Sequence, residues 1–168
     1  MQLRPLQPQD APFMLEWMHD PSVVKDLQAN FAAKTIDDCL AFIRSSADTT
    51  HDLHLAIVDD NDEYMGTVSL KHIQNAAAEF AITIRACAMG KGYSAYGMHS
   101  IIRKGFEELS LNNIYWCVSP KNQRAVRFYD KHCYPRVSVD LLQPPGYTPE
   151  QCSSYIWYAV TPSFETNR

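Results

Sequence analysis

Apolar residues recur at helix and strand spacings along the chain, and in its N-terminal third they predict one strand and two helices. The strand covers residues 1–6. The first helix covers residues 11–19 and is capped by Asp10. A capping box at residues 35–38 opens the second helix, which reaches Ser46. The N-terminal third is therefore expected to be mainly helical.

The rest of the chain alternates between short strand-like runs and two amphipathic stretches. The amphipathic stretches predict helices over residues 92–109 and 122–132, because their apolar residues fall on one helical face. The other runs predict a loop over 143–149 and strands over 53–58, 64–71, 80–84, 114–118, 137–142 and 155–160. This order predicts an α+β fold of three layers, with a mostly antiparallel, mixed central sheet and helices on both faces.

Length and composition are typical of one compact domain, here residues 1–168. A net charge of -4 argues against a nucleic-acid surface, and no apolar run reaches the ~18 residues of a membrane span. The five cysteines are scattered, which favours reduced thiols in the cytoplasm over a disulfide framework or a zinc site. We therefore expect a cytoplasmic protein that uses no metal, nucleic acid or membrane and is a monomer or homodimer.

The segment from Ile84 to Ser94 carries the most chemical information. A predicted strand ends there, a turn containing Gly90, Lys91 and Gly92 follows, and a long helix begins. Unpaired amides at a helix start, next to glycines that let a ligand approach the backbone, favour an anion site. The same pattern also fits a plain strand-to-helix turn. Its spacing excludes a P-loop and the dinucleotide-binding fingerprint.

Residues 89–94 resemble the coenzyme signature Q/R-x-x-G-x-G/A of the GNAT superfamily, the acetyl-CoA-dependent N-acetyltransferases. Gly92 matches that signature, whereas Met89 and Ser94 depart from it. An amide-lined turn depends more on its backbone than on its side chains, so the departures affect affinity more than the existence of the site. The resemblance implies acetyl-CoA as the acetyl donor, held by Ile84, Met89, Gly90, Lys91, Gly92, Tyr93, Ser94 and Asn122.

A second motif that looks like the family's begins at Asn122 and places Ala125 and Tyr129 at the family spacing. In the family the asparagine touches the pantetheine arm and the tyrosine lies near the coenzyme sulfur. The resemblance thus makes Tyr129 the candidate acid that protonates the departing thiolate, with a core tyrosine as the alternative. Residues 17–21 and 78–80 resemble the subgroup of ribosomal-protein alanine and aminosugar acetyltransferases.

Glu79 is the candidate general base, because acetyl transfer needs a neutral amine and a primary ammonium has a pKa near ~10.4. The glutamate begins the strand beside which the resemblance places the thioester, with a backbone N–H near Ile84 polarising the carbonyl. By strand periodicity it shares a face with Ala81 and Thr83. A solvated glutamate at a strand end is the alternative. Other groups that could take the proton are a water relay, His54, His72 and His99.

The sequence predicts an N-acetyltransferase that works by direct attack in a ternary complex. Its acceptor is a small-molecule amine, such as an aminosugar nucleotide or a polyamine, or a protein N-terminus. The acceptor pocket should involve residues 26–34 and 143–149. The rival interpretation is a non-catalytic acetyl-CoA-binding module with the same fold.

Overall fold

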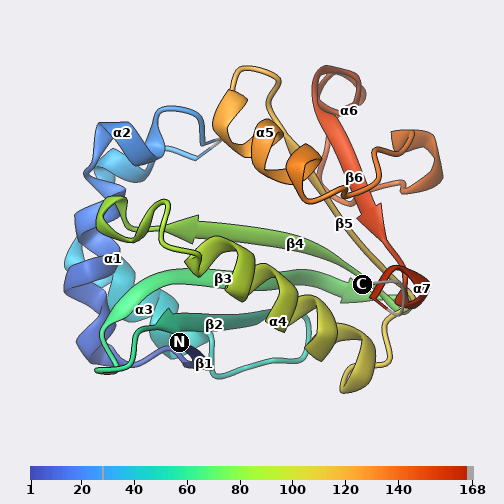
Figure 1. Cartoon of the computed structure of the whole chain (residues 1–168). Coiled ribbons are helices and arrows are strands. Elements are labelled where there is room, and N and C mark those ends of the chain that lie inside the picture. Colours follow the sequence, from blue (N-terminus) through green and yellow to red (C-terminus); the bar gives the residue numbers. More distant parts are fainter. Residues whose placement is uncertain (28, 166–168) are drawn as a thin grey trace.

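A computed structural model describes residues 1–27 and 29–165. Within them, six strands form one sheet in the order β1-β2-β3-β4-β5-β6 (Figure 1). Neighbouring strands are antiparallel except for β4 and β5, which are parallel, so the predicted mixed sheet is confirmed. The strands are β1 Gln2–Pro5, β2 Leu53–Val58, β3 Tyr64–Gln74, β4 Ala77–Ile84, β5 Asn113–Val118 and β6 Ile156–Val160.

Helices cover both faces of this sheet, as predicted (Figure 1). On one face, α1 (Ala11–Met18) and α3 (Ile36–Ser45) form a core with Ala56 and Val58 of β2. On the other face, α4 (Tyr93–Glu107) and α5 (Gln123–Lys131) join a larger core that includes Leu55 and Ile57. Shorter helical segments are α2 Pro21–Val24, α6 Pro149–Ser154, α7 Pro162–Glu165, η1 Pro8–Asp10, η2 Phe31–Ala33, η3 Ala86–Ala88 and η4 Val139–Leu141.

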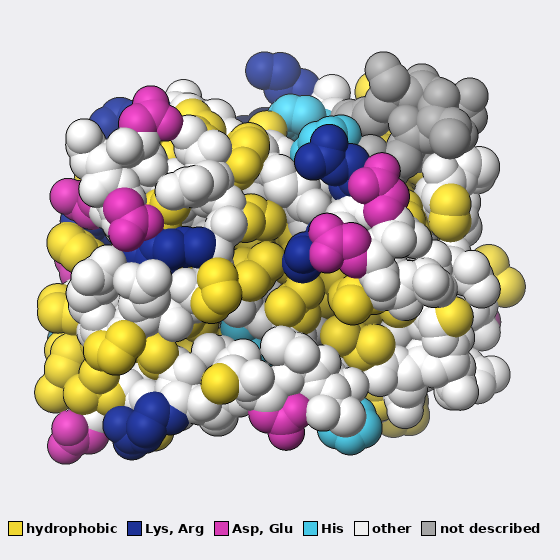
Figure 2. Space-filling view, turned by 90° about the horizontal axis from the view of Figure 1, so that it is seen from below, with side chains coloured by type: hydrophobic (Ala, Val, Ile, Leu, Met, Phe, Trp, Pro, Cys, Tyr) yellow, Lys and Arg dark blue, Asp and Glu magenta, His cyan; other side chains and the backbone are white. Residues whose placement is uncertain are grey.

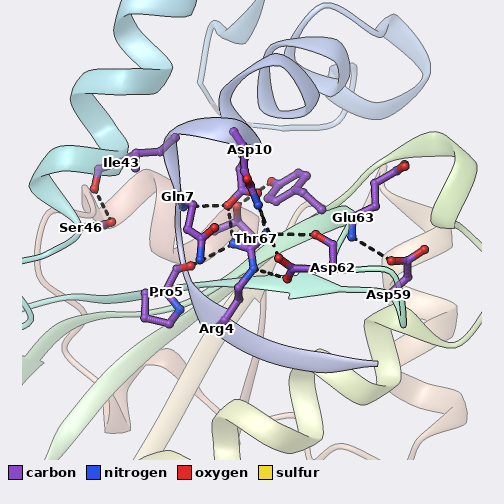
Figure 3. A network of polar contacts seen from close by, with 12 residues as sticks. Arg4, Pro5, Gln7, Asp10, Ile43, Ser46, Asp59, Asp62, Glu63 and Thr67 are labelled. Carbon is purple, nitrogen blue, oxygen red and sulfur yellow. Dashed lines mark hydrogen bonds and ion pairs between the residues drawn. The ribbon is translucent and has the colours of Figure 1, made fainter.

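Asp10 does not cap α1 with its side chain, which corrects the expectation from the sequence. The residue is 1% exposed, and its carboxylate accepts hydrogen bonds from Arg4 Nη1 at 2.8 Å and Nη2 at 2.9 Å (Figure 3). Arg4 Nε also donates to Asp62 Oδ1 at 2.6 Å, on the turn between β2 and β3. A buried ion pair stabilises only when its hydrogen bonds are this complete. The pair ties β1 to the start of α1 and to the neighbouring turn.

The hairpin of β3 and β4 is longer than predicted, because β3 continues beyond residue 71 to Gln74 and β4 begins before residue 80, at Ala77. Asn75 and Ala76 connect the two strands with φ angles of 50° and 58°, the left-handed values of a tight hairpin turn. The usual sequence signal for this turn is a glycine, which is absent here, so the periodicity alone ended β3 too early and began β4 too late. The register of the hairpin places Lys71 opposite Glu79.

The strand predicted over residues 137–142 is wrong. The segment contains η4, and among the described residues its neighbour Arg136 makes a single isolated bridge to Tyr158 of β6. Leu141 is 79% exposed, so the apolar residues that suggested a strand do not all reach a core. The chain then continues through the predicted loop to α6.

β4 and β5 diverge along their length. Their parallel pairing is restricted to residues 77–79 against 113–115. Beyond it, β4 stays paired with β3 as far as Ile84, and β5 stays paired with β6 as far as Val118. The two strands therefore splay apart, which opens a gap inside the sheet.

Candidate active site

A cavity of about 520 Å³ lies where β4 and β5 diverge. Its wall is built from β4, β5, the turn before α4, the start of α5 and two flanking loops. Three of the predicted site residues, Lys91, Gly92 and Tyr93, lie in the same turn but not in the cavity wall. The predicted site residues that do line it are Glu79, Ile84, Met89, Gly90, Ser94, Asn122 and Tyr129.

The turn before α4 has the backbone geometry of an anion site. Gly90 and Gly92 have φ angles of 75° and 89°, which glycine adopts without steric cost. Gly92 is the N-cap of the 15-residue α4, which no side chain of the described residues caps, so its first-turn amides lack side-chain acceptors. A Cβ built on Gly90 would meet no described atom within 4 Å. The open backbone and the helix start fit a pyrophosphate group.

Arg124 provides a cation beside this turn. Its Nη1 lies 2.9 Å from Met89 Sδ, so the first turn of α5 reaches across to the turn before α4. A guanidinium binds phosphate oxygens through two parallel hydrogen bonds, which a methionine cannot make. Arg124 therefore places positive charge next to the position where the family signature has Gln or Arg. Arg124 was not predicted from the sequence, although it lies two positions after Asn122 in the second motif.

Asn122 forms the N-cap of α5 through its side chain. Its Oδ1 accepts a hydrogen bond from the Ala125 backbone N–H at 3.1 Å. The cap accounts for an asparagine at this position without any ligand, and it also fixes the side chain in the cavity wall. A hydrogen bond from Asn122 to a ligand would come from its Nδ2 group.

Tyr129 lies both in the cavity wall and in the aromatic core. It is 7% exposed, and its ring centroid is 5.4 Å from that of Trp116 and 5.1 Å from that of Tyr158. Burial, with smaller contributions from Tyr158 and Tyr134, raises the pKa of the Tyr129 hydroxyl above its ordinary value. The hydroxyl therefore stays protonated at neutral pH, as a proton donor must.

Glu79 is not a solvated residue at a strand end. It is 4% exposed, and its Oε1 accepts a hydrogen bond of 2.6 Å from the Tyr147 hydroxyl. Lys71 Nζ lies 3.6 Å from Oε1, and His72 Nε2 lies 3.6 Å from Oε2. His72 therefore contacts the carboxylate, while neither it nor the other candidate histidines, His54 and His99, line the cavity.

The divergence of β4 and β5 connects the two faces of the sheet. Phe80 belongs to the core under α4 and α5, so the adjacent Glu79 points to the opposite face. Asn122 and Tyr129 are on α5, on the same side as Phe80. A donor held on the α4–α5 side and an acceptor held on the Glu79 side would thus meet in the gap between the strands.

Two loops border the cavity, as expected from the sequence. Asp26, Leu27, Ala29 and Phe31 line it from the first loop, whose residue 28 lies outside the described part of the chain. Tyr147 lines it from the second loop. Sequence patterns indicated these loops but not which of their side chains face the cavity, because loop residues carry no periodicity.

No cluster of three or more His, Cys, Asp or Glu that could hold a metal ion occurs in residues 1–27 and 29–165. Within the same ranges, no helix is long and apolar enough to cross a membrane. Figure 2 shows acidic and basic side chains interspersed on one face, with hydrophobic side chains gathered in its hollowed middle. Neither charge sign forms a continuous patch on that face.

Comparisons with known proteins agree with this architecture. The spermidine N-acetyltransferase from Vibrio cholerae, solved with CoA and spermine, has a TM-score of 0.76 at 18% identity and covers 96% of this chain and 95% of its own. A GNAT-family acetyltransferase from Bacillus anthracis has a TM-score of 0.73 at 17% identity and covers 95% and 93%. At these identities the structures show a shared fold.

The family follows from the sequence itself. No curated protein matches the chain. The family model described as "Acetyltransferase (GNAT) domain" matches residues 1–132, which is most of the chain. The chain therefore belongs to the GNAT family, the acetyl-CoA-dependent N-acetyltransferases.

Proposed function

We propose that residues 1–168 form one N-acetyltransferase domain that acetylates a small, cationic primary amine by direct attack on acetyl-CoA in a ternary complex. The observation that carries this proposal is the cavity that passes between β4 and β5. It brings the anion-binding turn, Asn122 and Tyr129 together with a buried carboxylate, Glu79. The free cysteines of the described chain also support a reducing, cytoplasmic location.

In the proposed step the amine nitrogen attacks the thioester carbonyl, so that a C–N bond forms and the C–S bond breaks. Glu79 accepts the proton that the nitrogen loses, and Tyr129 gives its hydroxyl proton to the departing thiolate. Both side chains return to their starting states by proton exchange with water. The growing charge on the carbonyl oxygen is stabilised by a backbone N–H near Ile84. The turn at residues 89–94, with Arg124 and Asn122, holds the coenzyme.

Two lining carboxylates support a polyamine among the possible acceptors. Asp26 and Glu79 both line the cavity. Of the two lining cations among the described residues, Lys71 lies beside Glu79 and Arg124 lies beside the turn proposed for the coenzyme. A polyamine would place its reacting nitrogen at Glu79 and a second ammonium near Asp26, whereas nucleotide phosphates would be repelled there. The Vibrio cholerae neighbour solved with spermine supports the same class. The resemblance of residues 17–21 and 78–80 supports an aminosugar or a protein N-terminus instead.

The test is a thiol-release assay with acetyl-CoA and a panel of acceptors: spermidine, spermine, an aminosugar nucleotide and a peptide with N-terminal alanine. We expect turnover with the polyamines and little with the other acceptors. Bound acetyl-CoA should also raise the melting temperature, since a hundredfold excess over Kd stabilises the fold by about 2.7 kcal/mol.

Asp26→Asn is the matched variant for the acceptor class. It should raise the KM for spermidine several-fold and leave the KM for acetyl-CoA unchanged. Turnover confined to the peptide or the aminosugar nucleotide would replace the polyamine with that acceptor. Coenzyme binding without transfer to any amine in the panel would favour the binding-module interpretation.

A further inference from the structure

Tyr147 makes a direct hydrogen bond to the proposed base. It lies in the loop between η4 and α6, and its hydroxyl donates to Glu79 Oε1 at 2.6 Å. The same hydroxyl accepts from Cys117 Sγ of β5 at 3.5 Å. The Tyr147 hydroxyl thus bridges β4 and β5, the two strands that diverge around the cavity.

The ring of Tyr147 is held in place independently of that hydrogen bond. It packs edge-on against Trp157 with a centroid distance of 5.1 Å and against Tyr155 with a centroid distance of 6.4 Å. Such aromatic pairs fix both the position and the tilt of a ring. The hydroxyl is therefore presented to Glu79 by a rigid support, although its backbone belongs to a loop.

Among the described residues, the Tyr147 hydroxyl is the one side-chain group that lies within hydrogen-bond distance of the Glu79 carboxylate. Lys71 Nζ and His72 Nε2 each lie 3.6 Å from a carboxylate oxygen of Glu79, which is longer than a hydrogen bond. A flexible side chain can keep such a distance in several orientations. The final torsion of a glutamate is broad and roughly twofold, so a carboxylate without a directional bond rotates freely. The hydrogen bond from Tyr147 removes that freedom.

Toward Glu79, the Tyr147 hydroxyl can act only as a hydrogen-bond donor. Burial, with the hydrogen bonds to Cys117 and Glu79, raises the pKa of its hydroxyl far above the ordinary value. The proton therefore stays on the phenol at any working pH, and Tyr147 itself neither takes nor gives up a proton during the reaction.

We propose that Tyr147 is a positioning residue that holds the Glu79 carboxylate in the orientation in which it accepts a proton from the acceptor amine. The inference rests on the proposed role of Glu79 as the base. It assigns to the loop at residues 143–149 a part in the reaction beyond bordering the acceptor site. Tyr147 acts on turnover through Glu79 and not through the coenzyme, whose turn lies at the other end of β4.

The test is a double-mutant cycle of Tyr147→Phe and Glu79→Gln in the full chain, with kcat and both KM values measured by thiol release. In the parent background, Tyr147→Phe should lower kcat about tenfold or more, because a hydrogen bond to a charged group is lost. The KM for acetyl-CoA should stay within twofold. In the Glu79→Gln background, the same change should alter kcat less than twofold. Tyr155→Phe is the control, since Tyr155 supports the same ring but does not line the cavity.

An equal loss of kcat in both backgrounds, or no loss in either, would overturn the positioning role while leaving Glu79 as the base. A Glu79→Gln variant with parental kcat would overturn the base assignment and the positioning role together. Crystal structures of the parent and of Tyr147→Phe, each with CoA, give a readout that needs no acceptor. We expect the Glu79 carboxylate to rotate in the variant, and an unchanged carboxylate would overturn the inference even if no substrate is found.

Discussion

The chemistry of the site depends on how individual side chains are buried. Tyr129 and Glu79 come from opposite faces of the sheet and are both nearly inaccessible to solvent. Tyr129 is surrounded by aromatic rings, and its burial raises the pKa of its hydroxyl, whereas Glu79 has a lysine, a histidine and a tyrosine around its carboxylate. These different surroundings fit the opposite roles proposed for the two side chains.

Replacing Tyr129 with Phe tests the proposed acid at the cost of one hydroxyl. We expect kcat to fall by roughly 10²- to 10⁴-fold, the range for loss of a general acid. The Kd for acetyl-CoA should change little, because the proposed function assigns the phosphates and the pantetheine arm to other residues. The ring keeps its contacts with Trp116 and Tyr158, so the fold should remain intact.

A purely structural role for Tyr129 predicts a different outcome. Turnover would then stay near normal in steady-state and single-turnover assays. Any effect would appear as a lower melting temperature, equivalent to about 1 kcal/mol for a lost hydrogen bond. Measuring kcat, Kd and melting temperature on one preparation separates the two roles.

At the scale of elements, the turn before α4 depends on its backbone conformation. Gly92→Val puts a β-branched side chain at a φ of 89°, a conformation that costs an ordinary residue roughly 1–2 kcal/mol. The nearest described atom to a new Cβ is Met1 Cε at 3.8 Å, so the cost is strain and not a clash. We expect weaker acetyl-CoA binding by about tenfold in calorimetric titration, as the turn shifts to relieve the strain.

Gly92→Asn is the matched control, because asparagine tolerates the left-handed region far better than valine. It should retain most of the affinity for acetyl-CoA. If both variants bind like the parent, then the pyrophosphate is held away from this turn. If both fail equally, side-chain volume and not backbone strain decides binding.

The elements that the sequence predicted well are those with a strong period or a cap. The long helix after the turn and the Thr35–Asp38 capping box are examples, and the capping box forms as expected. The strand predicted over residues 137–142 failed because its apolar residues mimic an alternating pattern in a segment whose Leu141 is exposed. Burial is a property of the whole fold, which no local window contains.

The candidate site shows the same division. The turn at residues 89–94 and Asn122 could be proposed from the sequence because short motifs constrain residues that are close in sequence. Lys71 could have been found from the hairpin register that sets it opposite Glu79, had the tight turn been recognised. The contact of Tyr147 with Glu79 could not have been predicted, because 68 residues separate the two and only the tertiary fold brings them together.

At the scale of the whole molecule, the free energy of unfolding should depend on pH through His54. Its Nδ1 is 2.7 Å from Ser69 Oγ, and its ring packs edge-on against Phe42 of α3 at 4.7 Å. Burial lowers the pKa of His54 below its ordinary value of 6.5. Below pH 6.5, His54 binds a proton in the unfolded chain but stays neutral in the folded chain until the pH reaches its lowered pKa. The free energy of unfolding therefore falls as the pH drops from the ordinary pKa to the lowered pKa of the folded state.

We therefore expect the melting temperature to decrease from pH 7.5 to pH 5 and the decrease to be smaller in His54→Gln. Carboxylates such as Asp38, whose pKa is lowered by hydrogen bonds from the Thr35 backbone and side chain, act only below their ordinary value of 3.8. They lie outside this window. An identical slope in parent and variant would assign the pH dependence to another group.

The gap between β4 and β5 also bears on self-association. Where the two strands part, residues 80–84 and 116–118 form two additional strand edges, whose backbone groups are not paired across the gap. Exposed edges of this kind are templates for pairing with another chain, and proteins protect them with charges and covering segments. Here the two edges face each other across a cavity of about 520 Å³, whose wall includes Asp26, Lys71 and Arg124. This space suits a slender ligand and not a second strand with its side chains. The unpaired backbone groups of these two edges thus lie inside the fold, where a second chain does not pair with them.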